Sequence, residues 1–437
     1  MGVLGDVVLP RERNRRTKRP WVRTVFGGPA AGRFTVRSLI AGLGLLCVTP
    51  SVVSCGGQSN AEPPAAGPTP VTFVSNGQRL NDMVGRGVAL ADFNGDGNLD
   101  AFVTNEVQPT GSDNRVYFGD GHGQFVDSGQ RLAGSYSVAQ SVVFDLDGNG
   151  TRDIIVGRTV WLNDGSGRFV PDTSRFVDSD GAAFSQCRLA DLNGDGRIDL
   201  FAITMMANME TTARVYLNDG TGHFRDTGHT PLPSVAAAVA LGDVNGDGSI
   251  DAVVSGWRNA SADPCPNRVL LNDGSGRFTD TGQQLDEGTR HSHSLALGDF
   301  DRDGDLDLML VTQGSPTARL YLNDGSGHFT AGRLLGTTDV EKVAVADFNG
   351  DGNLDVFLAC IGPDQVWLNN GRGEFTDAGL RLGTDWSWEV AVGDINRDGL
   401  PDLFVVNLGV DWSAPPESML RARRAEVWLN TSRTRRS

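Results

Sequence analysis

Five cysteines in 437 residues are too few for a fold that disulfides hold together. No apolar run approaches the roughly eighteen residues that a membrane-spanning helix needs. Basic side chains are also scarce, because 38 Lys and Arg stand against 54 Asp and Glu, for a formal net charge of −16. A nucleic-acid binder needs a basic face that follows the phosphates, so we expect no nucleic-acid partner. What remains is a soluble, acidic chain that is rich in glycine, with 57 residues of this type.

The first 54 residues differ in composition from the rest. They hold nine basic and two acidic side chains, followed by an apolar run at 39–48 and by Val-Val-Ser-Cys at 52–55. This order is typical of a secretory signal peptide, here residues 1–54 with a long basic region. Its end resembles a bacterial lipobox, in which Cys55 would be lipidated and become the new N-terminus. The alternative is an ordinary signal peptide with Cys55 near the cut.

These features predict an extracytoplasmic protein, at the cell surface or in the periplasm, whose one membrane contact is a lipid on Cys55; without that lipid it would be secreted. Residues 55–71 carry the lipidated cysteine and a Gly-, Pro- and Ala-rich linker with nothing to bury. Residues 431–437 form a basic tail. Cys187, Cys265 and Cys360 allow at most one disulfide, and the sequence does not choose the pair.

A nine-residue motif, D-x-[DN]-x-[DN]-G-x-x-D, occurs seven times between residues 92 and 402, with first aspartates 46 to 56 residues apart. Short β-branched and apolar runs flank each copy and predict buried strands. A third strand ends in an Asn-Asp-Gly type turn, and the Phe that closes this turn begins a fourth strand. Four antiparallel strands in each repeat predict an all-β, seven-bladed β-propeller over residues 72–430.

The two ends of the repeat region predict how the ring closes. The last repeat stops at 427–430, after its third strand, whereas residues 72–80 copy the fourth-strand pattern seen at 125–132 and 278–285. We therefore expect the N-terminal strand to pair with the last blade, which leaves no free sheet edge.

The motif also has the arrangement of a calcium loop. In an EF-hand, oxygens at positions 1, 3, 5 and 7 surround the ion, the last from the backbone, and Gly at position 6 permits the sharp turn. Here positions 1, 3, 5 and 9 are Asp or Asn, and position 6 is Gly, in all seven copies. The alternative is that Asp-rich turns merely link strands. We predict up to seven Ca²⁺ ions, one in each blade.

The predicted ligands, with position 7 contributing its carbonyl oxygen, are Asp92, Asn94, Asp96, Asn98 and Asp100; Asp145, Asp147, Asn149, Thr151 and Asp153; Asp191, Asn193, Asp195, Arg197 and Asp199; Asp243, Asn245, Asp247, Ser249 and Asp251; Asp299, Asp301, Asp303, Asp305 and Asp307; Asp347, Asn349, Asp351, Asn353 and Asp355; and Asp394, Asn396, Asp398, Leu400 and Asp402. Position 4 is Gly in five loops but Arg302 and Arg397 in the fifth and seventh, a change that can alter the local turn and removes no ligand. Pro401 at position 8 sets the seventh loop apart from the other six.

On these motifs the repeats resemble the FG-GAP repeat, also called VCBS, of integrin α-chain propellers and many secreted bacterial proteins. The resemblance covers residues 72–430. It implies calcium bound in a hairpin loop on one face of each blade, for stability rather than catalysis. The family includes sugar-binding lectins and some polysaccharide lyases, so membership does not define a function.

Strand order places the Asp loops and the Asn-Asp-Gly turns on one face, and loops of variable length on the other, where recognition is expected. Exposed Trp can stack on a sugar or anchor a peptide; alternatively it covers blade edges. His291 and His293 suit zinc, although no third ligand is evident. We expect Trp161, Trp367 and Trp428 to pack inside or between blades. The candidates on the variable face are Trp257, Arg258, His291, His293, Trp386, Trp388 and Trp412.

Two functions fit these features. The first is a calcium-stabilised binding or adhesion module, expected to be a monomer, that recognises a glycan or an extracellular protein. The second is a secreted carbohydrate-active enzyme of the polysaccharide lyase type, which would usually add loops with a convergent acid/base set. The longest variable stretch, 407–426, holds only a few charged groups, and no nucleophile or phosphate-binding motif is evident. We therefore expect a binder without catalytic residues.

Overall fold

The computed structural model divides the chain into one unit of residues 1–11 and 68–437 and another of residues 12–67. All residues that the structure describes belong to the first unit. They are 7–8, 70–80, 85–105, 113–133, 140–177, 182–205, 211–232, 236–256, 266–285, 292–312, 318–336, 339–408 and 424–432. Every secondary-structure element in these ranges is a β-strand. The described residues contain no helix that is long and apolar enough to cross a membrane.

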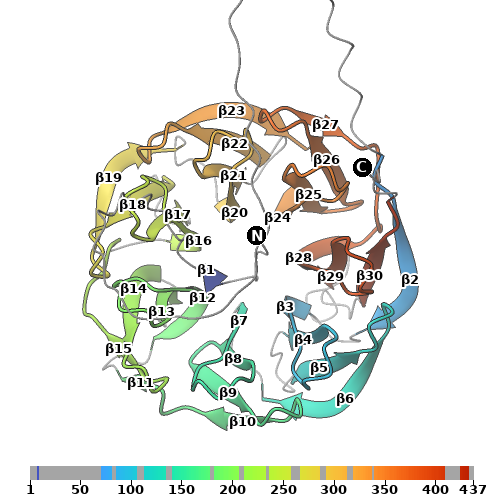
Figure 1. Cartoon of the computed structure of the whole chain (residues 1–437), viewed down its shortest axis with the longest axis horizontal. Coiled ribbons are helices and arrows are strands. Elements are labelled where there is room, and N and C mark those ends of the chain that lie inside the picture. The colour runs from blue at the N-terminus through green and yellow to red at the C-terminus, as the bar shows by residue number, and fades with distance from the viewer. Residues whose placement is uncertain are drawn as a thin grey trace, which may run out of the picture. The chain divides into compact units, whose positions relative to one another are not determined.

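The described unit is a ring of seven sheets (Figure 1). In chain order the blades are β3 (Gly85–Ala91), β4 (Asp100–Asn105), β5 (Asn114–Gly119) and β6 (Phe125–Leu132); β7 (Ser141–Phe144), β8 (Asp153–Val156), β9 (Thr159–Asn163) and β10 (Phe169–Asp172); β12 (Ala183–Ala190), β13 (Asp199–Met205), β14 (Thr211–Asn218) and β15 (Phe224–Asp226); β16 (Ala236–Gly242), β17 (Asp251–Gly256), β18 (Arg268–Asn272) and β19 (Phe278–Gln284); β20 (Ser292–Gly298), β21 (Asp307–Thr312), β22 (Ala318–Asn323) and β23 (Phe329–Leu335); β24 (Val340–Ala346), β25 (Asp355–Cys360), β26 (Gln365–Asn369) and β27 (Phe375–Asp377); and β28 (Trp386–Gly393), β29 (Asp402–Leu408), β30 (Ala425–Asn430) and β2 (Phe73–Leu80).

Each blade is an antiparallel meander whose first strand lies nearest the ring axis (Figure 1). The predicted all-β, seven-bladed propeller is therefore confirmed. The third blade has two additions. β1 (Val7–Val8) pairs in parallel with β12, and β11 (Phe176–Val177), on the chain leaving the second blade, pairs in parallel with β15.

The ring closes as the sequence predicts. β2 pairs antiparallel with β30, from Phe73 opposite Asn430 to Leu80 opposite Ala425. The Gln78 side chain then reaches the first blade, where its Nε2 donates to the Phe125 carbonyl at 3.0 Å and its Oε1 accepts from the Phe125 N–H at 2.8 Å. The N-terminal strand thus completes the last blade and also fastens it to the first.

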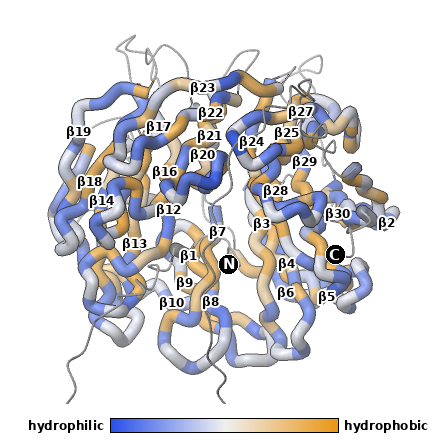
Figure 2. Tube along the Cα trace, turned by 45° about the horizontal axis from the view of Figure 1, so that its top comes forward, coloured by the Kyte–Doolittle hydropathy of each residue, from blue (hydrophilic) through white to orange (hydrophobic). Residues whose placement is uncertain are grey.

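Burial explains the strand patterns. Second strands such as β4 and β25 are buried at every residue, because a neighbouring blade covers each face. Fourth strands such as β6 are buried mainly at their ends and face solvent between them. Figure 2 shows apolar stretches along the strands and more hydrophilic loops at the ring's lower edge. This arrangement leaves the loops to carry the polar sites.

The cores lie between blades. One cluster combines Phe201 of the third blade with Val254 of the fourth, and the others join neighbouring blades in the same way. Trp161 and Trp367 are buried in such clusters and Trp428 packs against a third, as expected. Cys187 and Cys360 are buried, reduced residues in different blades, whereas Cys265 lies outside the described residues.

Polar side chains meet across the ring axis. Lys342 Nζ lies 2.9 Å from Glu389 Oε2, and Gln140 hydrogen-bonds the same carboxylate. Arg188 in turn donates to Gln140 Oε1 at 3.0 Å. These residues belong to the sixth, seventh, second and third blades, so the network links blades that are not neighbours.

Candidate functional site

Each Asp loop connects the first strand of a blade to the second. Position 9 is the first residue of the second strand in all seven blades, and the apolar residue at position 2 is buried in all seven. The loop is therefore anchored at both ends in the core, while positions 3 to 6 are mostly exposed.

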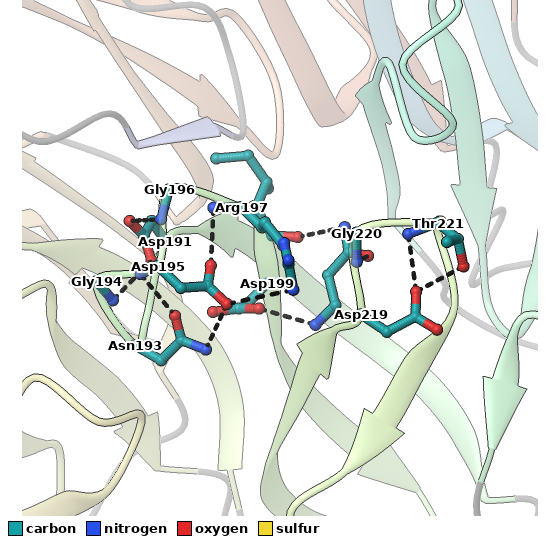
Figure 3. Close-up of polar contacts among 12 residues, drawn as sticks. Asp191, Asn193, Gly194, Asp195, Gly196, Arg197, Asp199, Asp219, Gly220 and Thr221 are labelled. Carbon is teal, nitrogen blue, oxygen red and sulfur yellow. Dashed lines mark hydrogen bonds and ion pairs between the residues drawn. The ribbon is translucent and has the colours of Figure 1, made fainter.

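The third loop shows how the backbone wraps around a carboxylate (Figure 3). Asp191 at position 1 accepts from the N–H of Gly194 at 2.7 Å and of Gly196 at 2.9 Å. Both glycines have positive φ, of 73° and 84°, a conformation that a side chain disfavours. These turns let both N–H groups donate to the one carboxylate.

The aspartate at position 9 ties the loop to the adjacent turn. Asp199 is buried, with Oδ2 accepting from the Leu192 N–H at 3.0 Å and Oδ1 from the Asn218 N–H at 2.8 Å. The same two bonds recur in every blade. Burial raises the pKa of these carboxyls and nearby loop aspartates add repulsion, whereas the backbone N–H groups oppose the shift. The pKa rises to about 7 in Asp355 and to about 6 in Asp100, Asp153, Asp199, Asp251, Asp307 and Asp402.

Two loops bring three carboxylates together. Asp145, Asp147 and Asp153 in the second, and Asp299, Asp301 and Asp307 in the fifth, each offer one oxygen within 4.8 Å of the others. Both loops have Asp at position 3. In the other five, position 3 is Asn, and its amide donates to the carboxylate at position 5, as Asn193 does to Asp195 at 3.1 Å. Among the described residues, these two groups are the ones with that geometry.

The donor set fits a hard cation. Oδ1 of Asp145, Asp243 and Asp299 is buried and accepts no hydrogen bond among the described residues. A buried oxygen without a donor is destabilising, and an ion is one explanation for it. Carboxylate, amide and carbonyl oxygens suit Ca²⁺ or Mg²⁺ and not a soft metal. The second and fifth loops therefore offer the most complete sites, and the predicted ligands of all seven loops stay predictions.

The last residue of the third strand has a role that the sequence analysis missed. Asn369 Nδ2 donates to Phe300 O in the preceding blade at 2.7 Å and to Leu354 O in its own at 3.1 Å. Asn163, Asn272, Asn323 and Asn430 make the same pair of bonds. This Asn was assigned to the turn that follows it; its recurrence at a strand end was the available signal for an inter-blade contact.

Arg302 and Arg397 leave the turn unchanged. Their φ angles are 64° and 62°, close to the 70–75° of the glycines at position 4 in the other five loops. The sequence allowed an altered turn here, but the backbone takes the same left-handed conformation at a cost of about 1 kcal/mol or more.

The opposite face carries an aromatic and charged cluster. Trp386 and Trp388 lie at the start of β28, whose other end leads into an Asp loop, and both are partly exposed. Their rings are 6.2 Å apart, and the Arg86 guanidinium lies 4.8 Å from the Trp388 ring. Burial raises the pKa of Glu341 to about 7, while the nearby Trp386 indole and the charge of Arg86 oppose the shift. We call Arg86, Glu341, Trp386 and Trp388 the indole cluster.

The other candidates on this face are not placed. Trp257, Arg258, His291 and Trp412 lie outside the described residues, as does the side chain of His293. Ile361 is 41% exposed and forms a bridge with Trp386, which extends the apolar surface beside the indole cluster.

Comparison with known protein families identifies the same repeat that the sequence motifs indicate. A model of the FG-GAP-like repeat matches residues 92–156, 191–254, 256–310, 305–358 and 347–405, more than half of the chain. No curated protein matches the sequence. The solved BP39L lectin of Burkholderia pseudomallei is 14% identical, with a TM-score of 0.54 over 80% of this chain and 96% of the lectin.

Two further solved structures are similar. BBS1N, in its complex with ARL6DN, is 12% identical, with a TM-score of 0.53 over 82% of this chain and 96% of BBS1N. An Agrocybe aegerita lectin that recognises non-reducing terminal N-acetylglucosamine is 22% identical, with a TM-score of 0.49 over 76% of this chain and 87% of the lectin. At these identities the likeness shows the fold alone.

Proposed function

The chain belongs to the family of FG-GAP-like repeat proteins, and we propose that it is a calcium-stabilised binding module for a glycan. The ligand is held on the face opposite the Asp loops. The signal peptide and the lipid on Cys55 that the sequence predicts support a location outside the cytoplasm, where millimolar calcium suits weak extracellular sites.

The carboxylate groups of the second and fifth loops carry the calcium proposal. Two unit charges 4 Å apart repel by about 4 kcal/mol at an effective dielectric of 20, so three clustered carboxylates strain a loop that lacks a cation. Asp145, Asp147 and Asp153, and Asp299, Asp301 and Asp307, would hold the ion. Calcium would neutralise this negative charge and accept six to eight oxygen ligands, and it would thereby stabilise the hairpin.

The indole cluster supports binding on the opposite face. Indole rings stack on the apolar faces of sugars, and a carboxyl and a guanidinium beside them can hydrogen-bond hydroxyl groups. Trp386 and Trp388 provide the rings and Glu341 and Arg86 the polar groups. Proteins of similar fold include both a lectin and BBS1N, which is solved with a protein partner, so the indole rings and not the fold favour a glycan.

A glycan array read in millimolar calcium tests the proposal. The matched variants are Trp388→Ala in the indole cluster and Val126→Ala on β6, where Val126 is 67% exposed on the rim. We expect the wild type and Val126→Ala to bind the same glycans, and Trp388→Ala to bind them at least about tenfold more weakly with an unchanged Tm. Equal binding by Trp388→Ala would contradict this site, and binding to no glycan would contradict the ligand class. Calcium-dependent release of reducing ends from acidic polysaccharides would point to a lyase instead.

A further inference from the structure

Position 4 of each Asp loop lies where one blade meets the next. A Cβ on Gly95 would lie 3.7 Å from the Gly165 carbonyl oxygen in the following turn, and a Cβ on Gly194 would lie 3.8 Å from that of Gly274. The same holds for Gly246, whose Cβ would lie 3.9 Å from the Gly325 carbonyl oxygen, so in these three loops backbone of the next blade lies beside position 4. A side chain at position 4 therefore has the neighbouring blade within reach.

Arg302 and Arg397 are the two residues at this position that have a side chain. They are also the two non-glycine residues with positive φ in the described part of the chain. The left-handed region is disfavoured for residues with a Cβ, and such strain persists where the surroundings hold it. At Arg302 and Arg397, the contacts of the two side chains are such surroundings.

Both side chains cross to the next Asp loop. Arg302 Nη2 donates to Gly352 O in the sixth loop at 2.5 Å, and Arg397 Nη1 donates to Asn98 Oδ1 in the first loop at 3.1 Å. Their stems pass over a turn glycine, since a Cβ on Gly371 would lie 3.3 Å from Arg302 Cδ, and one on Gly121 would lie 3.2 Å from Arg397 Cδ.

The segments they hold belong to the candidate ion sites. The N–H of Gly352 donates to Asp347 Oδ2 at 2.7 Å, and Asn98 is the position-7 residue whose carbonyl is a predicted ligand. On its own side, Arg397 directly precedes Asp398, whose N–H donates to Asp394 Oδ1 at 2.9 Å. Each arginine is thus fixed in one loop by its backbone and in the next by its guanidinium.

We propose that Arg302 and Arg397 are positioning residues that couple calcium binding in neighbouring loops, the fifth to the sixth and the seventh to the first. This inference rests on the proposed calcium sites. An ion bound in one loop restrains the backbone of that loop, including its arginine. Through its hydrogen bond, the guanidinium then restrains position 6 or 7 of the next loop. Linkage makes the effect reciprocal between the two sites.

Calcium titration followed by hydrogen exchange and mass spectrometry reads the loops separately. Peptides covering 299–307 and 347–355 report the fifth and sixth loops. Asp347→Ala disables the sixth site, alone or together with Arg302→Gly, a change that restores the residue of the five other loops. The matched control is Asp243→Ala in the fourth loop, read at the third loop, where position 4 is Gly194.

We expect Asp347→Ala to raise the calcium midpoint of the fifth loop by about fivefold or more, and by less than about twofold in the Arg302→Gly background. Asp243→Ala should leave the third loop unchanged. Equal shifts with and without Arg302, or no shift in the wild type, would overturn the coupling alone. Calcium-independent protection of every loop would overturn the calcium proposal and the coupling with it.

Discussion

Single residues decide how alike the seven loops are. Asp147 and Asp301 at position 3 join the carboxylates of positions 1 and 9, whereas Asn at this position pairs with the carboxylate at position 5. The fifth loop has an aspartate at all five odd positions, and repulsion from Asp303 and Asp299 contributes, after burial, to the raised pKa of Asp301. The side chain at position 3 therefore changes both the charge of a loop and the hydrogen bonds among its side chains.

The fifth and seventh loops should differ in calcium affinity. Asp299→Ala removes a carboxylate from the fullest set, so it should weaken its site by about tenfold or more, since ligand charge tunes affinity. Asp394→Ala should lower the calcium affinity of the seventh loop by a smaller factor. Site-resolved hydrogen exchange measures both, and a larger loss for Asp394→Ala would contradict the ranking.

Glu341 should make stability depend on pH. A carboxyl whose folded pKa is raised, here from 4.5 to about 7, contributes fully to stability below pH 4.5 and loses that contribution as the pH rises from 4.5 to about 7. Glu341→Gln mimics the protonated form, so its unfolding free energy should match that of the wild type near pH 4 and exceed it at pH 8 by at most about 3 kcal/mol, with a correspondingly higher Tm. Paired thermal melts with calcium held constant measure this. A difference that does not grow with pH would show that Glu341 is ionised throughout.

Among the elements, the strand-ending asparagines join the blades. Asn369→Ala removes the two hydrogen bonds that the amide nitrogen donates and the one that Oδ1 accepts from the Gly371 N–H. The Phe300 carbonyl keeps the Gly373 N–H as a donor, whereas the Leu354 carbonyl loses its side-chain donor, and the sum should destabilise the protein by about 2–3 kcal/mol. The neighbouring Asn370 is exposed in the turn, so Asn370→Ala is the matched control and should change stability by about 0.5 kcal/mol or less. Chemical denaturation compares the two, and equal effects would contradict the inter-blade role.

The first blade shows the limit of the pattern. Gly119 takes the place of that asparagine, and a Cβ there would lie 2.1 Å from the Leu99 carbonyl oxygen. The amide bridge is therefore missing where the ring closes, and Arg397 crosses the same junction from the other side.

Strands could be predicted from the sequence because burial follows chain order within each repeat. Contacts between blades could not, since Asn369 and Phe300 are 69 residues apart and Asn precedes a turn in any hairpin. The Asp loops were predicted from spacing, but not that Asp147 and Asp301 single out two of them, because this depends on where each side chain points. Trp386 and Trp388 were candidates, whereas Arg86 and Glu341 were not, since each belongs to another blade.

At the scale of the molecule, the ring is held at its circumference by β2 and across its axis by the Lys342–Glu389–Gln140–Arg188 network. Deleting residues 72–80 would expose the edge of β30 and remove the Gln78 contacts to the first blade. The truncated protein should aggregate or lose a large part of its stability. Size-exclusion chromatography and a melt check this, and a monomer with unchanged Tm would contradict closure by β2.

The thermal stability of the whole protein with and without calcium is the most direct test of the account. Each of the seven loops holds at least three aspartates, and in the second and fifth three carboxylates converge, so a chelator should lower the Tm markedly, and millimolar Ca²⁺ should restore it by mass action. Mg²⁺ should restore it poorly, because it demands a tighter octahedral shell. A Tm that is the same in chelator, Mg²⁺ and Ca²⁺ would contradict the calcium sites and leave the aspartates as turn residues.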